Sequence, residues 1–346
     1  MIYLKKYIFL FILIVFPISV YASPTIVMDV DSGRILYENN SHSKNLIAST
    51  TKIMTCIIVL ENSDIEKEIT VGEEVLDMEG TNIYINVGEK LKIKDLLYGL
   101  MLRSGNDAAE TLAYNTLGYE EFINKMNLKA KEIGMKDTTF SNPHGLDDKT
   151  SNYSTAYDMA LLSRYAYNNK IYRKIVNTKK YVTKSNLKSY AWYNRMSLIN
   201  KYKKCIGGKN GYTPKAGKSL VSYATNNNLT LSIVSLDDSE IYENHENLYE
   251  KYFSKYKRYL IVDKNSFYVH RNYYLKNSFY YPLKEDEIDD VTTLIEIFPT
   301  TKNNICGKIV INLNNKKVGE LTIYKKKNKK KKDISIFQKF KSLFIR

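Results

Sequence analysis

Hydrophobic and polar positions along the chain follow helical spacing in some segments and strand alternation in others. Residues 25–37 contain two apolar runs around an Asp-Ser-Gly turn, which predicts two adjacent strands. Residues 53–60 are apolar on nearly every helical face, so a helix there is expected to be central and buried. Similar patterns predict helices over 93–102, 107–117, 119–133, 156–167 and 240–256, and strands over 219–224 and 229–236.

The pattern changes near Tyr259. From there to Tyr324, short runs of β-branched and aromatic residues alternate with turns rich in asparagine, lysine and aspartate. The runs on either side of Asn314-Asn315 predict a hairpin. We therefore expect a β-rich domain over residues 259–324, after a domain of mixed helices and strands over residues 23–258.

The N-terminal segment has the composition of an export signal. Residues 1–22 begin with a positive region at Lys5 and Lys6, continue with an uncharged apolar stretch over 7–20, and end in Val-Tyr-Ala. This pattern is typical of a cleaved signal peptide, and the apolar stretch is short for a membrane span. The alternative is an uncleaved N-terminal anchor. In either case the bulk of the protein is expected to be exported.

Much of the net charge of +15 lies at the C-terminus, where residues 325–346 contain nine lysines and one arginine against one aspartate. The rest of the chain is close to neutral, so a basic groove for nucleic acid is not supported. In a helical projection of the last residues, one apolar sector contains Ile336, Phe337, Phe340, Leu343 and Phe344. The tail therefore predicts an amphipathic anchor on the outer face of the cytoplasmic membrane. The alternative is a solvated lysine tail.

The cysteine and histidine content argues against a disulfide-stabilised fold and against a zinc enzyme. Three scattered cysteines without a C-x-x-C pair do not form a disulfide framework. Four histidines without an H-E-x-x-H motif argue against a zinc enzyme.

A serine is expected at the first turn of the buried helix, and a lysine follows three residues later. In Ser49-Thr-Thr-Lys52, helical spacing places the hydroxyl and the amine on the same face. A serine needs a nearby base to act as a nucleophile, and a lysine desolvated by burial can lose its proton near neutral pH. The helix N-terminus adds N–H groups that can stabilise an oxyanion. The alternative is an N-cap serine beside a surface lysine, because S-x-x-K recurs at Ser41, Ser185 and Ser254.

Two further elements supply polar groups. Ser104-Gly-Asn106 interrupts two helical patterns, so its hydroxyl can relay a proton and its carboxamide can hold a peptide carbonyl or the base lysine. The alternative is a helix stop followed by a new cap. In the segment 207–213, Lys209 is expected to open a strand whose edge pairs with an extended peptide, and its ammonium suits a carboxylate. The alternative is a glycine-rich hairpin.

In this order and separation, the three elements resemble the penicillin-recognising serine acyltransferases, and among them the low-molecular-mass D-alanyl-D-alanine carboxypeptidases. The resemblance covers most of the exported chain, and its motif segments are 48–54, 102–109, 139–147 and 211–217. Class A β-lactamases differ, because they have aspartate in place of Gly105 and an E-x-x-L-N segment that this sequence lacks. The resemblance implies an α/β (α+β) fold of the serine β-lactamase and penicillin-binding-protein type. Such a fold has an antiparallel sheet and a buried central helix, here followed by a small β-rich domain.

The resemblance also implies a function in cell-wall biogenesis, as a serine-type carboxypeptidase acting on peptidoglycan stem peptides that end in D-Ala-D-Ala. It implies that Ser49 is the nucleophile, that Lys52 is its base, and that Ser104 passes a proton to the departing D-alanine. The residues that it implies for substrate binding are Asn106, Lys209, Asn210, Gly211 and Tyr212. The N–H groups of Ser49 and Tyr212 would form the oxyanion hole. β-Lactams would acylate Ser49 and leave slowly, and no metal or organic cofactor is implied.

One residue departs from the family pattern, because Asn210 stands where the family usually has threonine. Losing one hydrogen bond to a charged group costs about 1.5–3 kcal/mol, or about 10- to 150-fold in rate, so reduced or altered activity is expected. Two alternatives stay open: a D,D-endopeptidase that cleaves cross-linked peptides, and a weakly active scaffold that binds wall peptides. His144, in the Asn-Pro-His-Gly loop, is interpreted as a structural hydrogen-bonding residue.

Overall fold

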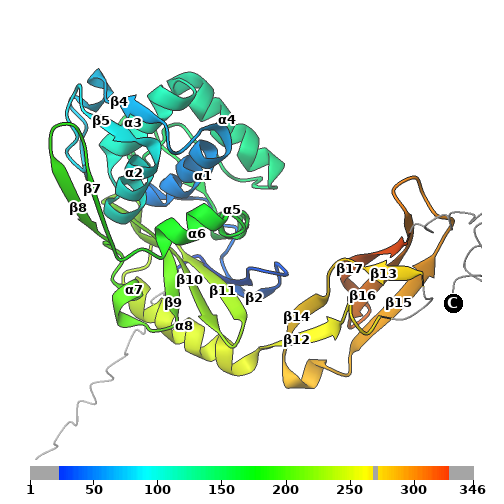
Figure 1. Ribbon diagram of the computed structural model, residues 1–346. Coiled ribbons are helices and arrows are strands. Elements are labelled where there is room, and N and C mark those ends of the chain that lie inside the picture. Colours follow the sequence, from blue (N-terminus) through cyan, green and yellow to red (C-terminus); the bar gives the residue numbers. More distant parts are fainter. Residues whose placement is uncertain (1–22, 268–271, 327–346) are drawn as a thin grey trace, which may run out of the picture.

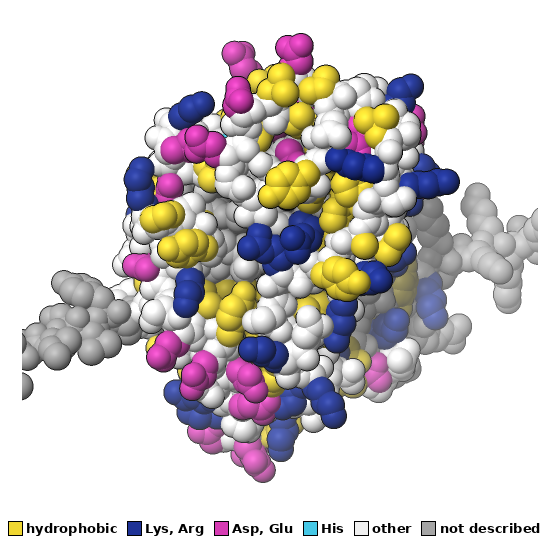
Figure 2. Space-filling view, turned by 90° about the vertical axis from the view of Figure 1, so that its left-hand side faces the viewer, with side chains coloured by type: hydrophobic (Ala, Val, Ile, Leu, Met, Phe, Trp, Pro, Cys, Tyr) yellow, Lys and Arg dark blue, Asp and Glu magenta, His cyan; other side chains and the backbone are white. Residues whose placement is uncertain are grey.

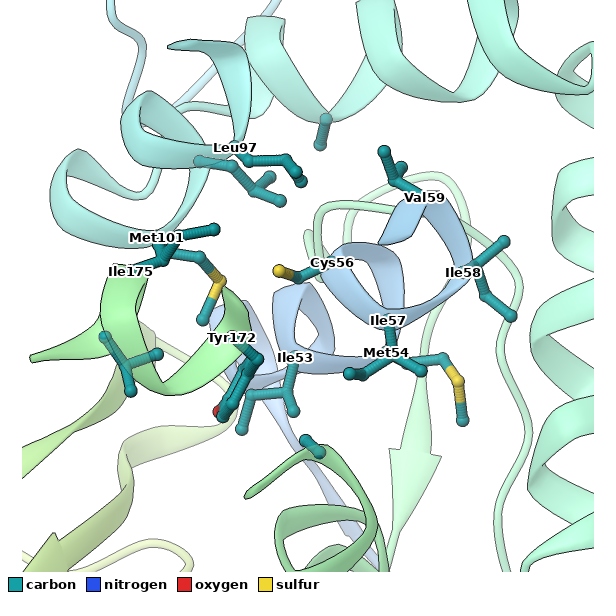
Figure 3. Packing of buried hydrophobic residues seen from close by; sticks show 14 of the residues in the cluster. Ile53, Met54, Cys56, Ile57, Ile58, Val59, Leu97, Met101, Tyr172 and Ile175 are labelled. Carbon is teal, nitrogen blue, oxygen red and sulfur yellow. The ribbon is translucent and has the colours of Figure 1, made fainter. Parts of the chain in front are cut away.

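The predicted central helix is α1, Lys52–Asn62, in which every residue from Lys52 to Val59 is buried. The structure is a computed structural model that describes residues 23–267 and 272–326 (Figure 1). Figure 3 shows how α1 packs, with Cys56 facing Leu97 and Met101 on one side and Ile53 facing Tyr172. The helices of this layer are α2 (Ile93–Tyr98), α3 (Asn106–Thr116), α4 (Tyr119–Glu132), α5 (Ala156–Tyr167) and α6 (Lys170–Val176).

A five-stranded antiparallel sheet lies against this layer, in the order β2-β1-β11-β10-β9. Helix α5 packs on one face of the sheet, and α8 (Ile241–Lys255) packs on the other. The strands are β1 (Thr25–Asp29), β2 (Ile35–Asn39), β9 (Cys205–Thr213), β10 (Gly217–Asn226) and β11 (Leu229–Ser235). Because β9 is an edge strand of the sheet, its outer side faces the end of the helical layer where α1 begins.

The remaining elements of residues 23–256 are short. They are β3 (Asn45–Leu46), η1 (Ala48–Thr51), β4 (Glu68–Thr70), η2 (Glu73–Val75), β5 (Lys90–Lys92), η3 (Gly99–Arg103), β6 (Tyr153–Ser154), β7 (Lys180–Lys184), β8 (Ser189–Tyr193) and α7 (Leu198–Lys201). The β7–β8 hairpin was not predicted from the sequence. Exposed and more buried residues alternate along both strands, but the exposed face also carries apolar side chains, Val182 at 62% and Tyr193 at 56% exposed. These residues obscure the apolar and polar alternation in the sequence.

The C-terminal residues fold as β-strands with a small apolar core of their own around Ile309, Ile311 and Ile323. The predicted hairpin at Asn314-Asn315 is confirmed, and both asparagines have positive φ (50° and 60°), as a tight two-residue turn requires. The strands are β12 (Lys257–Val262), β13 (Tyr273–Leu275), β14 (Phe279–Leu283), β15 (Val291–Ile297), β16 (Ile305–Leu313) and β17 (Lys316–Lys325), with the short turn η4 (Glu285–Glu287).

The α+β fold with a buried central helix and a β-rich C-terminal part is therefore confirmed. The domain boundary at 258/259 stays a prediction, although Arg34, which precedes β2, and Glu287 of η4 are joined across it by an ion pair of 2.6 Å. In the two described stretches of the chain, none of the helices is long and apolar enough to cross a membrane. The expected signal peptide and amphipathic tail lie outside the described residues.

Candidate functional site

The structure brings the Ser49 hydroxyl and the Lys52 amine together, as the spacing predicted. Lys52 Nζ lies 3.0 Å from Ser49 Oγ. The expectation that Ser49 belongs to the first turn of the α-helix was wrong in detail, because Ser49 lies in the 3₁₀ turn η1 and α1 begins at Lys52. The tighter 3₁₀ turn still stacks residues three apart on one face, so the contact survives the change of helix type.

The Lys52 amine is completely buried, and two of its three contacts are pure acceptors. Its Nζ donates to Asn106 Oδ1 at 2.7 Å and to the backbone carbonyl of His144 at 2.6 Å. The Asn106 amide nitrogen donates to the carbonyl of Glu79, which keeps the Asn106 oxygen facing the lysine. A neutral amine has two N–H groups and one lone pair. If these acceptors take the N–H groups, the lone pair faces Ser49.

Electrostatics favour the neutral form of Lys52. Burial lowers its pKa well below the usual value, and the charge of Lys209 lowers it further. Asp107 and Glu110 act in the opposite direction, because their carboxylates favour the ammonium form. The lowering effects are larger, so the amine loses its proton at a lower pH than an exposed lysine does, as a general base requires.

Ser104 and Lys209 form the second pair of the site, with Lys209 Nζ at 3.0 Å from Ser104 Oγ. Ser104 has a left-handed backbone (φ 66°) at the point where η3 ends and α3 begins, so the predicted interruption between two helices is confirmed. Such a conformation is costly for a residue other than glycine and often marks a functional position. Burial lowers the pKa of Lys209 to about 7, assisted by the charge of Arg195.

The expectation that Lys209 opens a strand was wrong, because Lys209 lies in the middle of β9. The two glycines before it suggested a turn, but they belong to the strand. A Cβ at Gly207 would come within 2.6 Å of the Val176 carbonyl, and one at Gly208 within 2.2 Å of the Val221 carbonyl. Glycine is therefore needed there for close backbone packing.

Strand β9 continues past the N-terminal turn of the central helix. A Cβ on Gly211 would lie 2.8 Å from the Ser49 nitrogen, so this glycine allows the strand backbone to pass directly over η1. Asn210 is half-buried, and its backbone carbonyl accepts a hydrogen bond of 2.6 Å from Lys209 Nζ. Tyr212, near the end of β9, is 64% exposed. The Ser49 and Tyr212 N–H groups thus lie on adjacent elements, and their oxyanion role stays a prediction.

The face of the molecule that carries β7 and β8 shows Lys and Arg side chains near its centre, surrounded by separate hydrophobic side chains (Figure 2). The most exposed large hydrophobic residue in the described chain is Tyr84, at 74%. Its carbonyl accepts a hydrogen bond from Lys188 of the β7–β8 turn.

Sequence reasoning missed several groups around the site. Asp107 is buried and accepts hydrogen bonds from the backbone N–H groups of Ile83 and Ile85, which holds the segment after Glu79 beside α3. Burial raises the pKa of Asp107, opposed by these bonds. His144 is confirmed as a hydrogen-bonding residue, but its carbonyl also contacts Lys52. Backbone carbonyls carry no side-chain signal in a sequence, so only the fold reveals this contact.

Comparisons with known proteins identify the family of the chain. The family model described as D-alanyl-D-alanine carboxypeptidase (Peptidase_S11) matches residues 14–240. D-alanyl-D-alanine carboxypeptidase DacF of Bacillus subtilis is 35% identical over 215 residues, which cover 60% of this chain and 55% of DacF. DacB2 of Mycobacterium tuberculosis is 32% identical over 216 residues, with 62% of this chain and 74% of that protein covered.

Among solved structures, penicillin binding protein 5 from Haemophilus influenzae superimposes with a TM-score of 0.73 at 25% identity. The match covers 90% of this chain and 98% of that one. It therefore includes the β-rich C-terminal part as well as the helical layer and the sheet. By sequence alone, the chain spans about half the length of its Bacillus relative.

Proposed function

The chain belongs to the D-alanyl-D-alanine carboxypeptidase family, Peptidase_S11, and from this premise we propose that it removes the terminal D-alanine from peptidoglycan stem peptides. The observation that carries the proposal is the Ser49–Lys52 contact of 3.0 Å, in which the lysine is buried and its other two contacts are acceptors. This arrangement supplies a nucleophile and an oriented base, the two groups that acyl transfer to a serine requires.

The proposed reaction proceeds through an acyl-enzyme. Ser49 Oγ attacks the carbonyl carbon of the D-Ala-D-Ala bond while Lys52 accepts its proton, and the Ser49 and Tyr212 N–H groups stabilise the oxyanion. The C–N bond then breaks. Ser104 passes a proton to the departing D-alanine amine, and Lys209 holds the terminal carboxylate. Water then hydrolyses the serine ester and releases the shortened peptide.

The direct test is release of D-alanine by the purified protein from a diacyl-D-Ala-D-Ala tripeptide. We expect release that stops after pre-treatment with penicillin, because the drug acylates Ser49. Product analysis with defined muropeptides distinguishes the carboxypeptidase from a D,D-endopeptidase, since only the latter opens cross-linked dimers. A protein that binds penicillin and wall peptides but releases no D-alanine would be a scaffold instead.

Asn210 provides a prediction about substrate carboxylate binding. Asn210→Thr restores the hydroxyl that the family usually has at this position, next to Lys209 on β9. We expect kcat/KM for the tripeptide to rise by about tenfold, the value of one hydrogen bond to a charged group. Steady-state kinetics measure this effect. Asn210→Ser is the matched variant, and equal or lower kcat/KM in both variants would contradict the prediction.

We also propose that the protein is exported and held at the outer face of the cytoplasmic membrane by residues 335–346. The proposal is supported by the sequence pattern of the two chain ends: a positively charged apolar leader, and a lysine run before an amphipathic segment. Deleting residues 335–346 is expected to move the protein from the membrane to the soluble fraction and to leave penicillin binding intact. Fractionation after labelling measures both, and an unchanged membrane fraction would contradict the anchor.

A further inference from the structure

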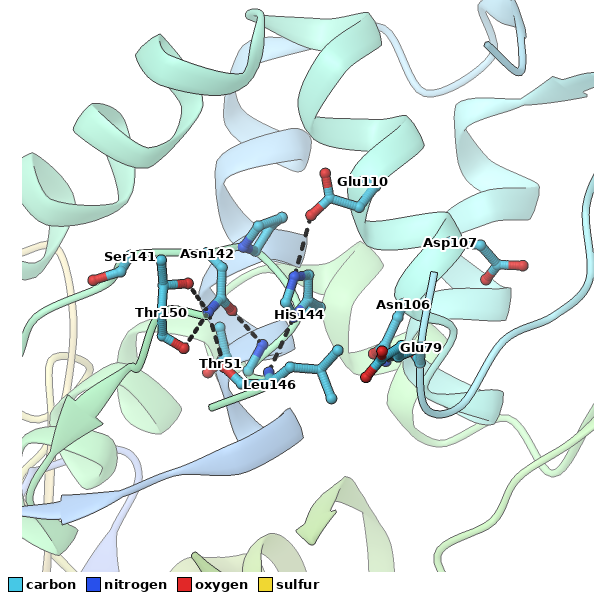
Figure 4. A network of polar contacts seen from close by, with 12 residues as sticks. Thr51, Glu79, Asn106, Asp107, Glu110, Ser141, Asn142, His144, Leu146 and Thr150 are labelled. Atoms are coloured by element: carbon cyan, nitrogen blue, oxygen red, sulfur yellow. Dashed lines mark hydrogen bonds and ion pairs between the residues drawn. The ribbon is translucent and has the colours of Figure 1, made fainter. Parts of the chain in front are cut away.

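Glu110 and His144 form a largely buried contact beside the loop that carries Leu146 (Figure 4). His144 Nε2 lies 3.3 Å from Glu110 Oε1, and the two side chains are only 12% and 9% exposed. Glu110 is on α3, four residues after Asn106, so the two side chains project from one side of the helix. One turn of α3 therefore supplies both a ligand of the lysine and a partner of the histidine.

The hydrogen bonds of the His144 ring determine its tautomer. The backbone N–H of Leu146 donates to Nδ1 at 3.0 Å, so Nδ1 carries a lone pair. The ring proton is therefore on Nε2, and it points at the Glu110 carboxylate. The imidazole is held from both sides, by its own loop and by α3.

The same residue presents its backbone carbonyl to Lys52 at 2.6 Å. The neighbours of His144 are tied to the central helix and to the loop itself: Thr55 Oγ1 donates to the Pro143 carbonyl, and the Gly145 N–H donates to Asn142 Oδ1. The link from His144 to α3 is the imidazole–carboxylate contact. Loss of that contact would leave the carbonyl less constrained on the side that faces Asn106.

We propose that the Glu110 carboxylate and the His144 imidazole are a positioning pair for Lys52, which holds the His144 carbonyl against the amine so that the lone pair faces Ser49. The inference rests on the proposed function, since it assigns a role to the base of that reaction. Small displacements of a catalytic group lower reaction rates steeply. The Glu110–His144 contact can therefore affect the rate of acylation although neither side chain contacts the substrate.

Glu110 also affects Lys52 by its charge. The groups that face the amine are Lys209 on β9, Asp107 and Glu110 on α3, and His144 on its loop. The Glu110 carboxylate raises the pKa of Lys52, against the lowering by burial and Lys209. Glu110→Gln keeps an acceptor for the His144 N–H but removes the charge, so it separates the electrostatic effect from the positioning effect. Glu110→Leu removes both.

The experiment is the second-order rate of acylation by a fluorescent penicillin, measured from pH 5 to 10 on the full-length protein. For Glu110→Gln we expect a plateau rate within about threefold of wild type and an acid limb displaced to lower pH, because Lys52 then loses its proton more readily. For Glu110→Leu we expect a plateau rate at least about tenfold lower. Glu89→Gln, which alters a buried carboxylate that contacts Tyr190, is the matched control and is expected to leave the acid limb unchanged.

Three outcomes would overturn the proposal. The first is a plateau rate of Glu110→Gln as low as that of Glu110→Leu, which would assign the effect to the charge and not to the hydrogen bond with His144. The second is a folded Glu110→Leu variant with a normal plateau, which would make the pair purely structural. The third is a wild-type protein that penicillin does not label, which would refute the proposed function as well. Should Glu110→Leu not fold, the plateau rate of His144→Phe decides the question, because this variant removes the contact from the histidine side and keeps the backbone carbonyl that faces Lys52.

Discussion

Replacing Ser49 with alanine is expected to abolish covalent labelling by penicillin and to reduce D-alanine release by at least about 10³-fold. The substitution removes only the hydroxyl group, whose oxygen lies 3.0 Å from the buried Lys52 amine that activates it. Without it, no serine ester forms at this position, and residual catalysis comes from substrate binding and oxyanion stabilisation alone. Intact-mass spectrometry after exposure to penicillin measures the adduct directly.

The same variant is expected to fold normally. Ser49 is partly exposed in η1, and its loss removes one hydrogen bond, which contributes about 1 kcal/mol to the free energy of unfolding. Ser254→Ala is the matched control, because Ser254 belongs to another S-x-x-K sequence but bonds only the carbonyl of Lys251 on the surface of α8. An adduct that persists in Ser49→Ala, or one that maps to a different serine, would refute Ser49 as the nucleophile.

The sequence predicted the fold well where an element has one clear periodicity. Helix α1 is apolar all around because it is buried all around, and this signal is unambiguous. The β7–β8 hairpin was missed because apolar residues such as Val182 and Tyr193 lie on its exposed face and obscure the strand alternation in the sequence. The start of β9 was predicted at the wrong residue, because two consecutive glycines usually indicate a turn. In the structure, Gly207 and Gly208 lie in the strand and allow close backbone packing.

In the site, residue spacing predicted the contacts between residues close in sequence. The order of the motifs along the chain predicted the contacts between residues far apart in sequence. Ser49 and Lys52 are three residues apart, so helical geometry alone places them together. The contact between Ser104 and Lys209 joins residues 105 positions apart, and only the resemblance to a known family suggested it. The Lys52–His144 contact could not be predicted from the sequence. Its acceptor is a backbone carbonyl, and the position of that carbonyl depends on a loop 92 residues away from Lys52.

Replacing Lys52 with methionine is expected to lower the acylation rate by about 10²- to 10⁴-fold, the usual contribution of a general base. Methionine fills similar volume in the buried space but cannot accept the Ser49 proton. Stopped-flow labelling with a fluorescent penicillin measures the rate. Lys52→Arg is expected to fail to a similar extent, because a guanidinium stays protonated at all accessible pH values.

Lys52→Met is also expected to change how the free energy of unfolding depends on pH. Burial lowers the pKa of Lys52 in the folded protein, while in the unfolded chain the amine keeps a pKa near 10.5. Between these two values the unfolded state binds the extra proton, so the free energy of unfolding rises with pH across this window. One such group contributes a slope of up to about 1.4 kcal/mol per pH unit.

Urea titrations between pH 7 and 10 should therefore show a shallower rise in Lys52→Met than in the wild type, with the remaining rise contributed by Lys209, whose pKa is lowered to about 7. Lys125→Met, on the exposed side of α4, is the matched control and is expected to retain the wild-type slope. If Lys52→Met lost activity but kept the full slope, the lysine would be charged in the folded protein at neutral pH. A charged amine has no lone pair to accept the Ser49 proton. That result would therefore refute Lys52 as the base, although Ser49 could still be the nucleophile.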